Sequence, residues 1–274
     1  MWIDAHAHVD RYELVGEGAL QAALAEIQQL GVLTISNSMD PASYERNLAI
    51  AAQNEWVLPI FGVHPWNAPA WAERLDELAQ PVRQSPMLGE IGLDFCFVRD
   101  AAQYPAQRTV LEFFLCAAEE QGKVVHLHTK GAEDTILELL QRYDLPRVVV
   151  HWYSGPLGVL RRLADRGTFF TMGIEPRYSD HLRHIVQEIP DSQLLTETDN
   201  PGGPKGMIGG PGHPGLIKEV VDTLAHVKHS SPEEICALVR ANLTRLIASD
   251  PWLRVRRAKE TAMRTDPWRA FLRD

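Results

Sequence analysis

The stretch IDAHAHVD at residues 3–10 carries two histidines and two carboxylates at every second position, directly after a single apolar residue. Successive side chains of a strand point to opposite faces, so these four polar side chains would share one face. Imidazoles and carboxylates gathered in this way are potential ligands for a divalent metal ion. A His-x-His pair is only a moderate signal by itself, because surface strands carry such pairs too.

Similar polar residues end five later β-rich runs, namely His64, Glu90, His128, His151 and Asp199. The carboxyl ends of parallel strands in a closed barrel converge. With His6 and His8 the strand ends carry five imidazoles and two carboxylates, and burying even four of these imidazoles with both carboxylates would be very costly without a cation to satisfy them. Six side chains exceed the needs of one tetrahedral ion, and two ions about 3.5 to 4 Å apart with a bridging carboxylate fit the number better. Nitrogen and oxygen ligands leave Zn²⁺, Mn²⁺, Co²⁺ and Mg²⁺ open.

These residues must be positioned by the alternation of β-rich and helical runs along the chain. Eight buried strands are predicted, namely the one in IDAHAHVD and residues 32–36, 56–63, 86–92, 123–128, 147–152, 168–173 and 192–198. Helical patterns follow at about residues 18–30, 41–54, 70–80, 105–121, 132–143, 156–165, 180–188 and 214–229. This order predicts an α/β fold, a (β/α)8 TIM barrel. The alternative is a doubly wound open sheet, but no Gly-rich phosphate loop follows the first strand.

Two segments extend the chain beyond the barrel pattern. Ser231 and Pro232 open a further helix that continues to about Ala248. We expect one domain over residues 1–250 and a C-terminal extension over residues 251–274 that is helical. The extension has seven Lys or Arg and three acidic residues, and its apolar side chains would dock on the barrel. An arm for a protein partner or for nucleic acid is the alternative.

Composition narrows the function classes. A net charge of −9 argues against a nucleic-acid binder that relies on a broadly basic surface, but not against an enzyme that handles phosphates at bound metal ions. No apolar run approaches the length of a membrane span, and no signal peptide is recognised at the first residues. Three scattered cysteines fit free thiols, so we expect a cytoplasmic protein that does not enter a membrane.

Six motifs resemble, in order and spacing, those of the TatD-type metal-dependent hydrolases of the amidohydrolase superfamily. They are IDAHAHVD, GVHPW (62–66), GEIGLDF (89–95), HLHTK (126–130), HWYSG (151–155) and TETDNP (196–201). The resemblance covers about residues 2–248. It implies one ion held by His6 and His8. It implies a second ion held by His128 and His151, with Glu90 bridging the two.

The resemblance also implies roles for residues around these ligands. Asp199 would ligate the first ion and orient or deprotonate the attacking water. His64 would hydrogen-bond substrate or leaving group, and Glu197 would fix a histidine tautomer. Lys130 departs from the family, which usually has Arg there; Lys keeps the charge for substrate binding but loses the bidentate fork.

The Gly- and Pro-rich loop at residues 202–213 is a second departure from the family. As a lid it would bring Lys205 or His213 to the substrate, and a flexible connection is the other interpretation. His126 points the same way as His128 by strand alternation. We expect it in the barrel interior or behind the ligands, although a place in the site itself is open.

We therefore predict a metal-dependent hydrolase, a TatD-type deoxyribonuclease of exonuclease type. It would cleave phosphodiesters of single-stranded DNA or strand ends with a metal-activated water, two divalent ions (Mg²⁺, Mn²⁺ or Zn²⁺), and Asp199 and Glu90 as catalytic residues. The alternative keeps the site and changes the bond, as in an esterase, an amidase or a D-aminoacyl-tRNA deacylase. A third hypothesis is a non-catalytic metal-binding subunit that docks through the basic tail.

Overall fold

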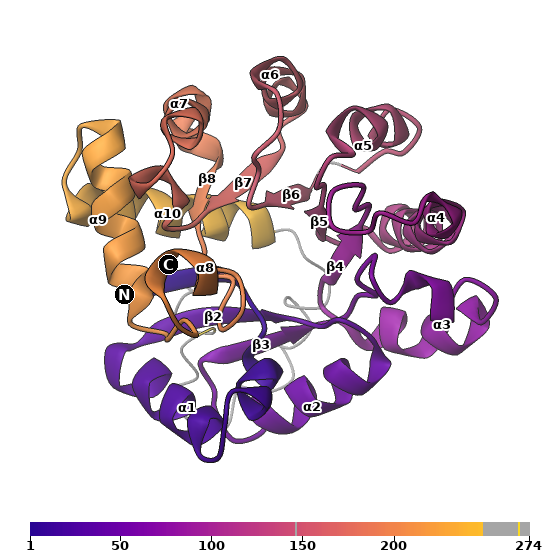
Figure 1. Ribbon diagram of the computed structural model, residues 1–274, viewed down its shortest axis with the longest axis horizontal. Helices are drawn as coiled ribbons and strands as arrows, with labels where there is room; N and C mark the ends of the chain where they lie inside the picture. Colours follow the sequence, from indigo (N-terminus) through magenta and orange to yellow (C-terminus); the bar gives the residue numbers. More distant parts are fainter. Residues whose placement is uncertain (146, 249–267, 269–274) are drawn as a thin grey trace.

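The computed structural model describes residues 1–145, 147–248 and Trp268. Within these residues eight parallel strands follow one another in chain order, three in one hydrogen-bonded sheet (β1–β3) and five in a second (β4–β8) (Figure 1). Their bounds are β1 Trp2–Ala7, β2 Val32–Asn37, β3 Val57–Ile60, β4 Leu88–Gly92, β5 Val125–His128, β6 Val148–His151, β7 Phe169–Met172 and β8 Leu194–Thr196. Parallel strands in this order confirm the predicted fold class.

Two junctions link the sheets without a continuous hydrogen-bonded ladder. Between β3 and β4, Phe61 pairs with Leu88 in an isolated parallel bridge. Between β8 and β1, the Asp199 N–H donates to the His6 carbonyl over 2.9 Å, just beyond the last residue of β8. The polar ends of the strands therefore meet in one place.

Helices surround the strands in Figure 1. They are α1 Ala19–Leu30, α2 Pro41–Ala51, α3 Leu75–Gln84, α4 Tyr104–Gln121, α5 Glu133–Leu140, α6 Leu157–Asp165, α7 Asp180–Glu188, α8 Lys205–Ile208, α9 Leu216–Lys228 and α10 Pro232–Ile247. Short 3₁₀ helices lie at Val9–Leu14, Ala68–Ala70, Ala101–Gln103, Glu175–Arg177 and Asp191–Gln193. Buried side chains of the helices, such as Phe114 and Leu160, form one core cluster with strand residues such as Leu33, Ile60 and Phe170.

The helices begin where the sequence offers caps. The Asp40 carboxylate accepts the Ser43 N–H over 2.8 Å at the start of α2. At α10, Ser231 and Glu234 form a reciprocal capping box ahead of Pro232. These local signals explain why the predicted starts of both helices agree with the structure.

The bounds predicted for the third helix, residues 70–80, are wrong at both ends. Ala68–Ala70 form a 3₁₀ turn, and α3 begins only at Leu75 and runs through Pro81 to Gln84. Proline removes a helical hydrogen bond, yet Leu78 and Val82 on either side of it are buried in the core. Packing outweighs the lost hydrogen bond here. Residues 205–208 of the predicted loop also form a short helix, α8.

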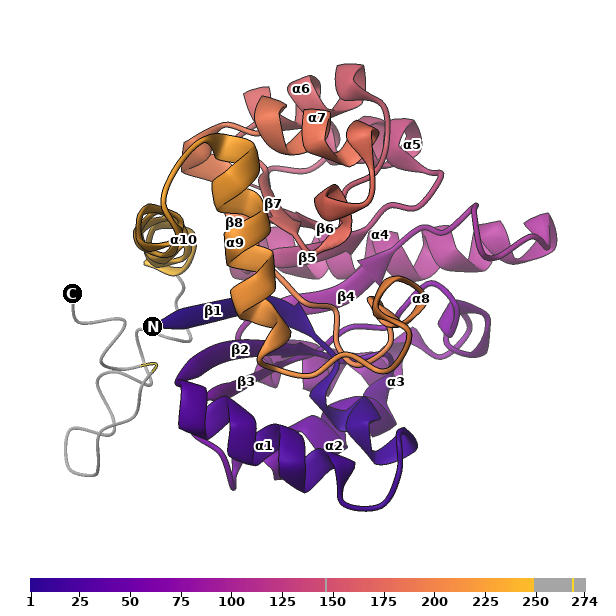
Figure 2. The same cartoon turned by 60° about the vertical axis from the view of Figure 1, so that its left-hand side comes forward.

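The far ends of the barrel differ. Figure 2 shows α10 near the start of β1, whereas α8 lies near the opposite ends of the strands.

Except for Trp268, the predicted extension over residues 251–274 lies outside the described residues, and its helical structure stays a prediction. Trp268 is buried, and its indole N–H donates to the Trp56 carbonyl over 3.2 Å. No helix in the described ranges is long and apolar enough to cross a bilayer.

Asn242 ties α10 to the start of β8. Its buried side-chain amide donates to the Asp191 and Leu194 carbonyls, each over 2.7 Å. We expect Asn242→Ala to lower the free energy of unfolding by about 2 to 3 kcal/mol, because it leaves two carbonyls unsatisfied at this interface. Urea unfolding followed by circular dichroism measures the change. The control Gln53→Ala removes an exposed amide and should stay within about 0.5 kcal/mol; equal losses in both variants would contradict the role of Asn242.

Candidate metal centre

Seven side chains predicted at strand ends come together at the carboxyl ends of the strands, namely His6, His8, His64, Glu90, His128, His151 and Asp199. They come from β1, β4, β5 and β6 and from the residues that follow β1, β3 and β8. All are buried except Asp199, which is partly exposed. Solvent therefore reaches the cluster at the side where Asp199 lies.

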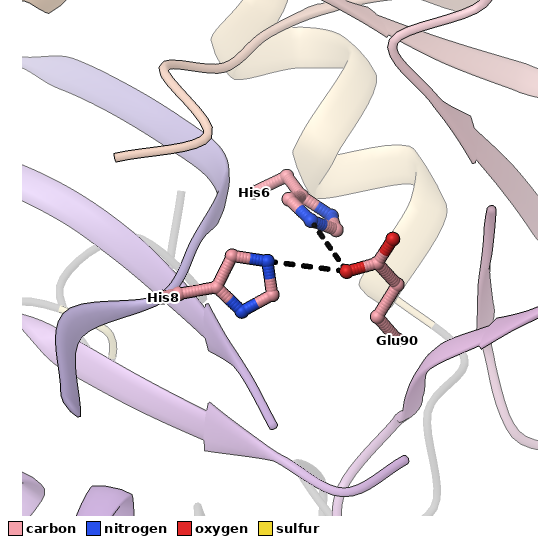
Figure 3. A group of neighbouring side chains, drawn as sticks. All are labelled: His6, His8 and Glu90. Carbon is pink, nitrogen blue, oxygen red and sulfur yellow. Dashed lines mark ion pairs between the residues drawn. The ribbon is translucent and has the colours of Figure 1, made fainter. Parts of the chain in front are cut away.

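Glu90 lies at the middle of the cluster, and its two oxygens face different imidazoles. Oε2 lies 3.1 Å from Nε2 of His8 and 3.4 Å from Nε2 of His6 (Figure 3). Oε1 lies 2.7 Å from Nδ1 of His128 and 2.8 Å from Nε2 of His151. One carboxylate thus links two pairs of histidines from three different segments of chain.

Asp199 closes the cluster on the side of His6 and His8. Its Oδ1 lies 3.3 Å from Nε2 of His8 and 3.8 Å from Nε2 of His6. Its backbone is left-handed, with φ of 50°, and Trp152, which follows His151, has φ of 41°. Such conformations cost on the order of 1–3 kcal/mol each for non-glycine residues. The surrounding structure holds both residues in place against this cost.

The donor atoms of the cluster suit divalent cations. Among the described residues neither ring nitrogen of His6 makes a hydrogen bond, although the side chain is fully buried. The His6 ring stacks on that of His151 with centroids 3.9 Å apart. Three groups have ligand atoms within 4.8 Å of one another: His6, His8 and Glu90; His6, His151 and Glu197; His64, Glu90 and His128. Buried imidazoles without partners beside carboxylates fit metal ligation.

Burial and charge set the protonation of the cluster. Burial lowers the pKa of His6 and His151, and it lowers that of His64 to about 4. Burial alone would raise the pKa of Glu90, but the neighbouring histidines, His151 and His64 foremost, hold it well below its usual range. Burial would lower the pKa of His8 and His128 too, but contact with Asp199 and Glu90 raises that of His8, and contact with Asp94 and Glu90 raises that of His128. Metal ions bind neutral imidazoles and ionised carboxylates, so metal binding would displace protons from these two histidines.

Further hydrogen bonds orient the ligand candidates. Nδ1 of His8 donates to the Asn37 carbonyl over 3.0 Å, which turns Nε2 toward Glu90. Oδ2 of Asp94 lies 3.1 Å from Nε2 of His128. Such partners fix the tautomer and angle of an imidazole. Of the four polar residues in IDAHAHVD, only the two histidines face Glu90.

The two aspartates of that motif support the backbone around the site. Asp4 accepts the N–H and the hydroxyl of Thr198 over 2.9 and 2.6 Å, next to Asp199. Asp10 accepts the Ser43 hydroxyl over 2.8 Å. Glu197 accepts the Thr171 hydroxyl over 2.6 Å. These carboxylates hold the strand-end loops.

The four predicted substrate-binding residues lie at different distances from the cluster. His64 joins it, with Nε2 3.4 Å from Oε1 of Glu90. The Lys130 ammonium donates to the Trp152 carbonyl over 2.5 Å and to the Ser154 hydroxyl over 3.0 Å.

The other two lie on the loop at residues 202–213, and the structure does not bring them into the cluster. Lys205 is exposed at the start of α8. Nδ1 of His213 lies 3.1 Å from Oε1 of Glu26 on α1, outside the cluster. Their contact with substrate stays a prediction.

Two residues near the site were missed or underrated from the sequence. Glu175 follows β7, the one strand end among β3–β8 to which no candidate was assigned. It is buried, its Oε2 has no hydrogen-bond partner in the described chain, and burial raises its pKa to about 8. Asp94, in the motif GEIGLDF, was not among the candidate site residues, yet it contacts His128. His126 is buried with its ring centroid 6.3 Å from that of His6, behind the ligand candidates.

Histidines and carboxylates gathered at the carboxyl ends of a (β/α)8 barrel define the class of metal-dependent hydrolases. The sequence model of one such family, described as TatD related DNase, matches residues 3–248. The chain therefore belongs to the TatD family, as its motifs predicted, and is a metal-dependent hydrolase.

Relatives and solved structures agree with this assignment. The chain is 24% identical to "Uncharacterized metal-dependent hydrolase YabD" of Bacillus subtilis (strain 168), over 90% of this chain and 98% of that protein. It is 28% identical to "3'-5' ssDNA/RNA exonuclease TatD" of Enterobacter lignolyticus, over 72% and 79%. The crystal structure of YJJV, a TatD homologue from Escherichia coli, superposes with a TM-score of 0.75 at 29% identity, over 89% of this chain and 97% of that one.

Because Glu90 lies between the two pairs of histidines, metal binding should depend strongly on its negative charge. We expect Glu90→Gln to weaken divalent-metal binding by at least about 10-fold. Loss of a residue that only hydrogen-bonds to a metal ligand already lowers metal affinity by about that factor, and Glu90 is itself a proposed ligand. Plasma mass spectrometry after reconstitution with Mn²⁺ or Zn²⁺, together with calorimetric titration, gives the measurement. Glu219→Gln, on an exposed carboxylate paired with Arg177, is the control. Metal content unchanged in Glu90→Gln would refute this assignment.

Proposed function

We propose that the protein is a deoxyribonuclease that hydrolyses phosphodiester bonds of single-stranded DNA or strand ends at two divalent ions. The observation that carries the proposal is Glu90, whose two oxygens face two separate pairs of imidazoles. The description of the matching family and the name of the Enterobacter relative support nucleic acid as the substrate class.

The proposed ligands follow from the two sides of Glu90. His6 and His8, with Asp199, would hold one ion. His128 and His151 would hold the other, and Glu90 would bridge them. When bound, such ions lower the pKa of a water toward neutrality and neutralise charge on a phosphate. Mg²⁺, Mn²⁺ and Zn²⁺ all suit these nitrogen and oxygen ligands.

Asp199 is the proposed proton acceptor. Its Oδ1 faces His8, which leaves Oδ2 to orient the attacking water and take its proton. Burial would raise the pKa of Asp199, but its contact with His8 holds the pKa below the usual range, so the carboxylate is ionised before it accepts the proton. The partly exposed position of Asp199 suits a group that meets water from the open side of the cluster.

Lys130 and His64 are the proposed contacts for the phosphate and the leaving group. An ammonium has three N–H donors, and Trp152 and Ser154 accept two of those of Lys130, which leaves one for a phosphate oxygen. His64 is buried and its pKa is about 4, so it would act as a neutral imidazole. Lys205 would reach substrate from α8 if the loop closes, whereas the contact of His213 with Glu26 favours an anchoring role.

The second candidate function is ester or amide hydrolysis at the same site. It is favoured by Lys130, which stands where the resemblance leads one to expect Arg and whose ammonium is already held by two partners. A single remaining N–H suits one oxygen better than a bidentate phosphate contact.

The unpaired thiols of Cys96, Cys116 and Cys236 support a place in the reducing cytoplasm.

The nuclease proposal is tested by Asp199→Asn beside wild type. After chelation and reconstitution with Mg²⁺ or Mn²⁺, wild type should degrade labelled single-stranded DNA, and Asp199→Asn should lower kcat by about 10²- to 10⁴-fold, the range for loss of an acid–base group. Gel analysis of labelled oligonucleotides measures both rates, and Asp222→Asn on α9 is the control. Cleavage of ester substrates with no cleavage of single- or double-stranded DNA would favour the second candidate.

The loop beyond Asp199 offers a matched pair of glycine substitutions. A Cβ on Gly203 would lie 2.3 Å from Oδ2 of Asp199 and 2.3 Å from Cζ3 of Trp152, whereas a Cβ on Gly202 would meet nothing within 4 Å. We expect Gly203→Ala to reduce kcat by about 10- to 100-fold, because the proposed proton acceptor must move. Gly202→Ala should retain the wild-type rate. Both rates are measured on the same labelled DNA. Equal rates in the two variants would contradict the proposal that catalysis depends on the position of Oδ2 of Asp199.

A further inference from the structure

Two large aromatic side chains are exposed beside the metal centre. Trp66 is 49% exposed and Phe97 is 64% exposed, and their ring centroids lie 6.2 Å apart with the rings inclined by 75°. They come from the segments that follow β3 and β4. In the described part of the chain the other strongly exposed aromatic side chain is Tyr178. Adjacent exposed rings at an active site, in contrast to a scattered exposed residue, indicate a binding surface.

One buried carboxylate, that of Asp94, holds the Trp66 ring and the backbone that carries Phe97. The Trp66 indole N–H donates to Oδ2 of Asp94 over 2.6 Å. Oδ1 of Asp94 accepts the backbone N–H of Phe97 over 2.7 Å and that of Cys96 over 2.9 Å. The same Oδ2 lies 3.1 Å from Nε2 of His128. The indole of Trp66 and the backbone of Phe97 are therefore positioned before any ligand arrives, and both are tied through Asp94 to His128, a proposed metal ligand.

The pair also adjoins the reacting centre through His64. The rings of Trp66 and His64 meet edge to face with centroids 4.6 Å apart. Nε2 of His64 in turn lies 3.4 Å from Oε1 of Glu90. One imidazole thus separates the exposed indole from the central carboxylate. Because Asp94 already satisfies the indole N–H, the ring has an apolar face to offer and no polar group that needs a partner.

We propose that Trp66 and Phe97 form a stacking platform for the unpaired base next to the scissile phosphodiester. This inference rests on the proposed nuclease function and specifies its substrate as a strand whose terminal bases are unstacked. Every base has a π-face, so an aromatic platform binds single strands with little regard to sequence. Inside a duplex both faces of a base are covered by its neighbours, and the platform has nothing to receive.

Because the protein is acidic, its affinity for a nucleic-acid strand should depend on base stacking. A net charge of −9 opposes the broad counterion release on which strongly basic nucleic-acid binders rely. Contacts away from the metal ions must then come from groups that do not depend on charge. We therefore expect the affinity for a single strand to fall only shallowly with salt and to depend steeply on the two rings.

The test compares wild type with Phe97→Ala and Trp66→Ala on a labelled single-stranded oligonucleotide and on the same strand with abasic terminal nucleotides. KM in Mn²⁺ measures binding to the metal-loaded protein, and fluorescence anisotropy on the full-length, chelated protein isolates the contribution of the two rings. Each substitution should weaken binding of the normal strand about 10-fold, within the range for one stacked base. Wild type should lose a similar factor on the abasic strand, whereas Phe97→Ala should barely distinguish the two strands.

Three controls separate stacking from structural damage. Leu48→Ala removes an exposed apolar side chain from α2 and should leave binding unchanged. Trp66→Phe keeps a ring but loses the bond to Asp94, and it should retain more affinity than Trp66→Ala. Metal content should stay at the wild-type level in Phe97→Ala, because Asp94 accepts the backbone N–H of residue 97, which this substitution keeps.

The outcomes separate this inference from the nuclease proposal. If wild type degrades single-stranded DNA while the ring substitutions and abasic nucleotides leave binding and KM unchanged, the platform is wrong and the nuclease proposal stands. If wild type degrades no DNA yet binds the strand through both rings and the terminal bases, the platform stands and the nuclease proposal fails. If wild type binds no single strand in either assay, the platform is wrong.

Discussion

The buried carboxylate of Glu90 is the constraint on which the rest of the structure depends. A buried charge is stable only with partners on every side, and here the partners are imidazoles from several strands. They reach Glu90 only if neighbouring strands approach very closely. A Cβ on Gly62 would lie 2.4 Å from the carbonyl carbon of Gly89, and one on Gly92 would lie 2.0 Å from the His128 carbonyl oxygen. Glycine is required at these two positions because no side chain fits.

The site and the least regular parts of the barrel coincide. The two junctions without continuous ladders are those between β3 and β4 and between β8 and β1. Glu90 lies on one side of the first junction, and Asp199 hydrogen-bonds across the second. Departure from regular pairing lets β4 and the segment after β8 turn their carboxylates inward. The left-handed backbone of Asp199 is part of the same arrangement, since strain of this kind persists only where surrounding contacts hold it.

The sequence predicted those features that depend on period and order. Alternation in IDAHAHVD was enough to put His6 and His8 on one face, and the parallel order of strands was enough to bring His128 and His151 to the same end. Pairwise contacts depend on loop paths, which have no period. Thus the bond from Asp94 to His128, the burial of Glu175 and the contact of His213 with Glu26 appear only in three dimensions. The helix running through Pro81 was mispredicted because a local rule was outweighed by tertiary packing.

An acidic protein that acts on a polyanion must confine attraction to a small region. Burial favours the neutral form of the imidazoles in the cluster. Contact with Asp199 and Glu90 raises the pKa of His8 against this effect of burial. The cluster itself therefore holds little positive charge. The ammonium of Lys130 is a cation at its rim, and burial lowers the pKa of this group. Divalent ions would therefore supply most of the attraction for a phosphate, and they attract it only at short range in salt. A strand held mainly by such ions needs uncharged contacts to position it, and the proposed platform of Trp66 and Phe97 would supply them.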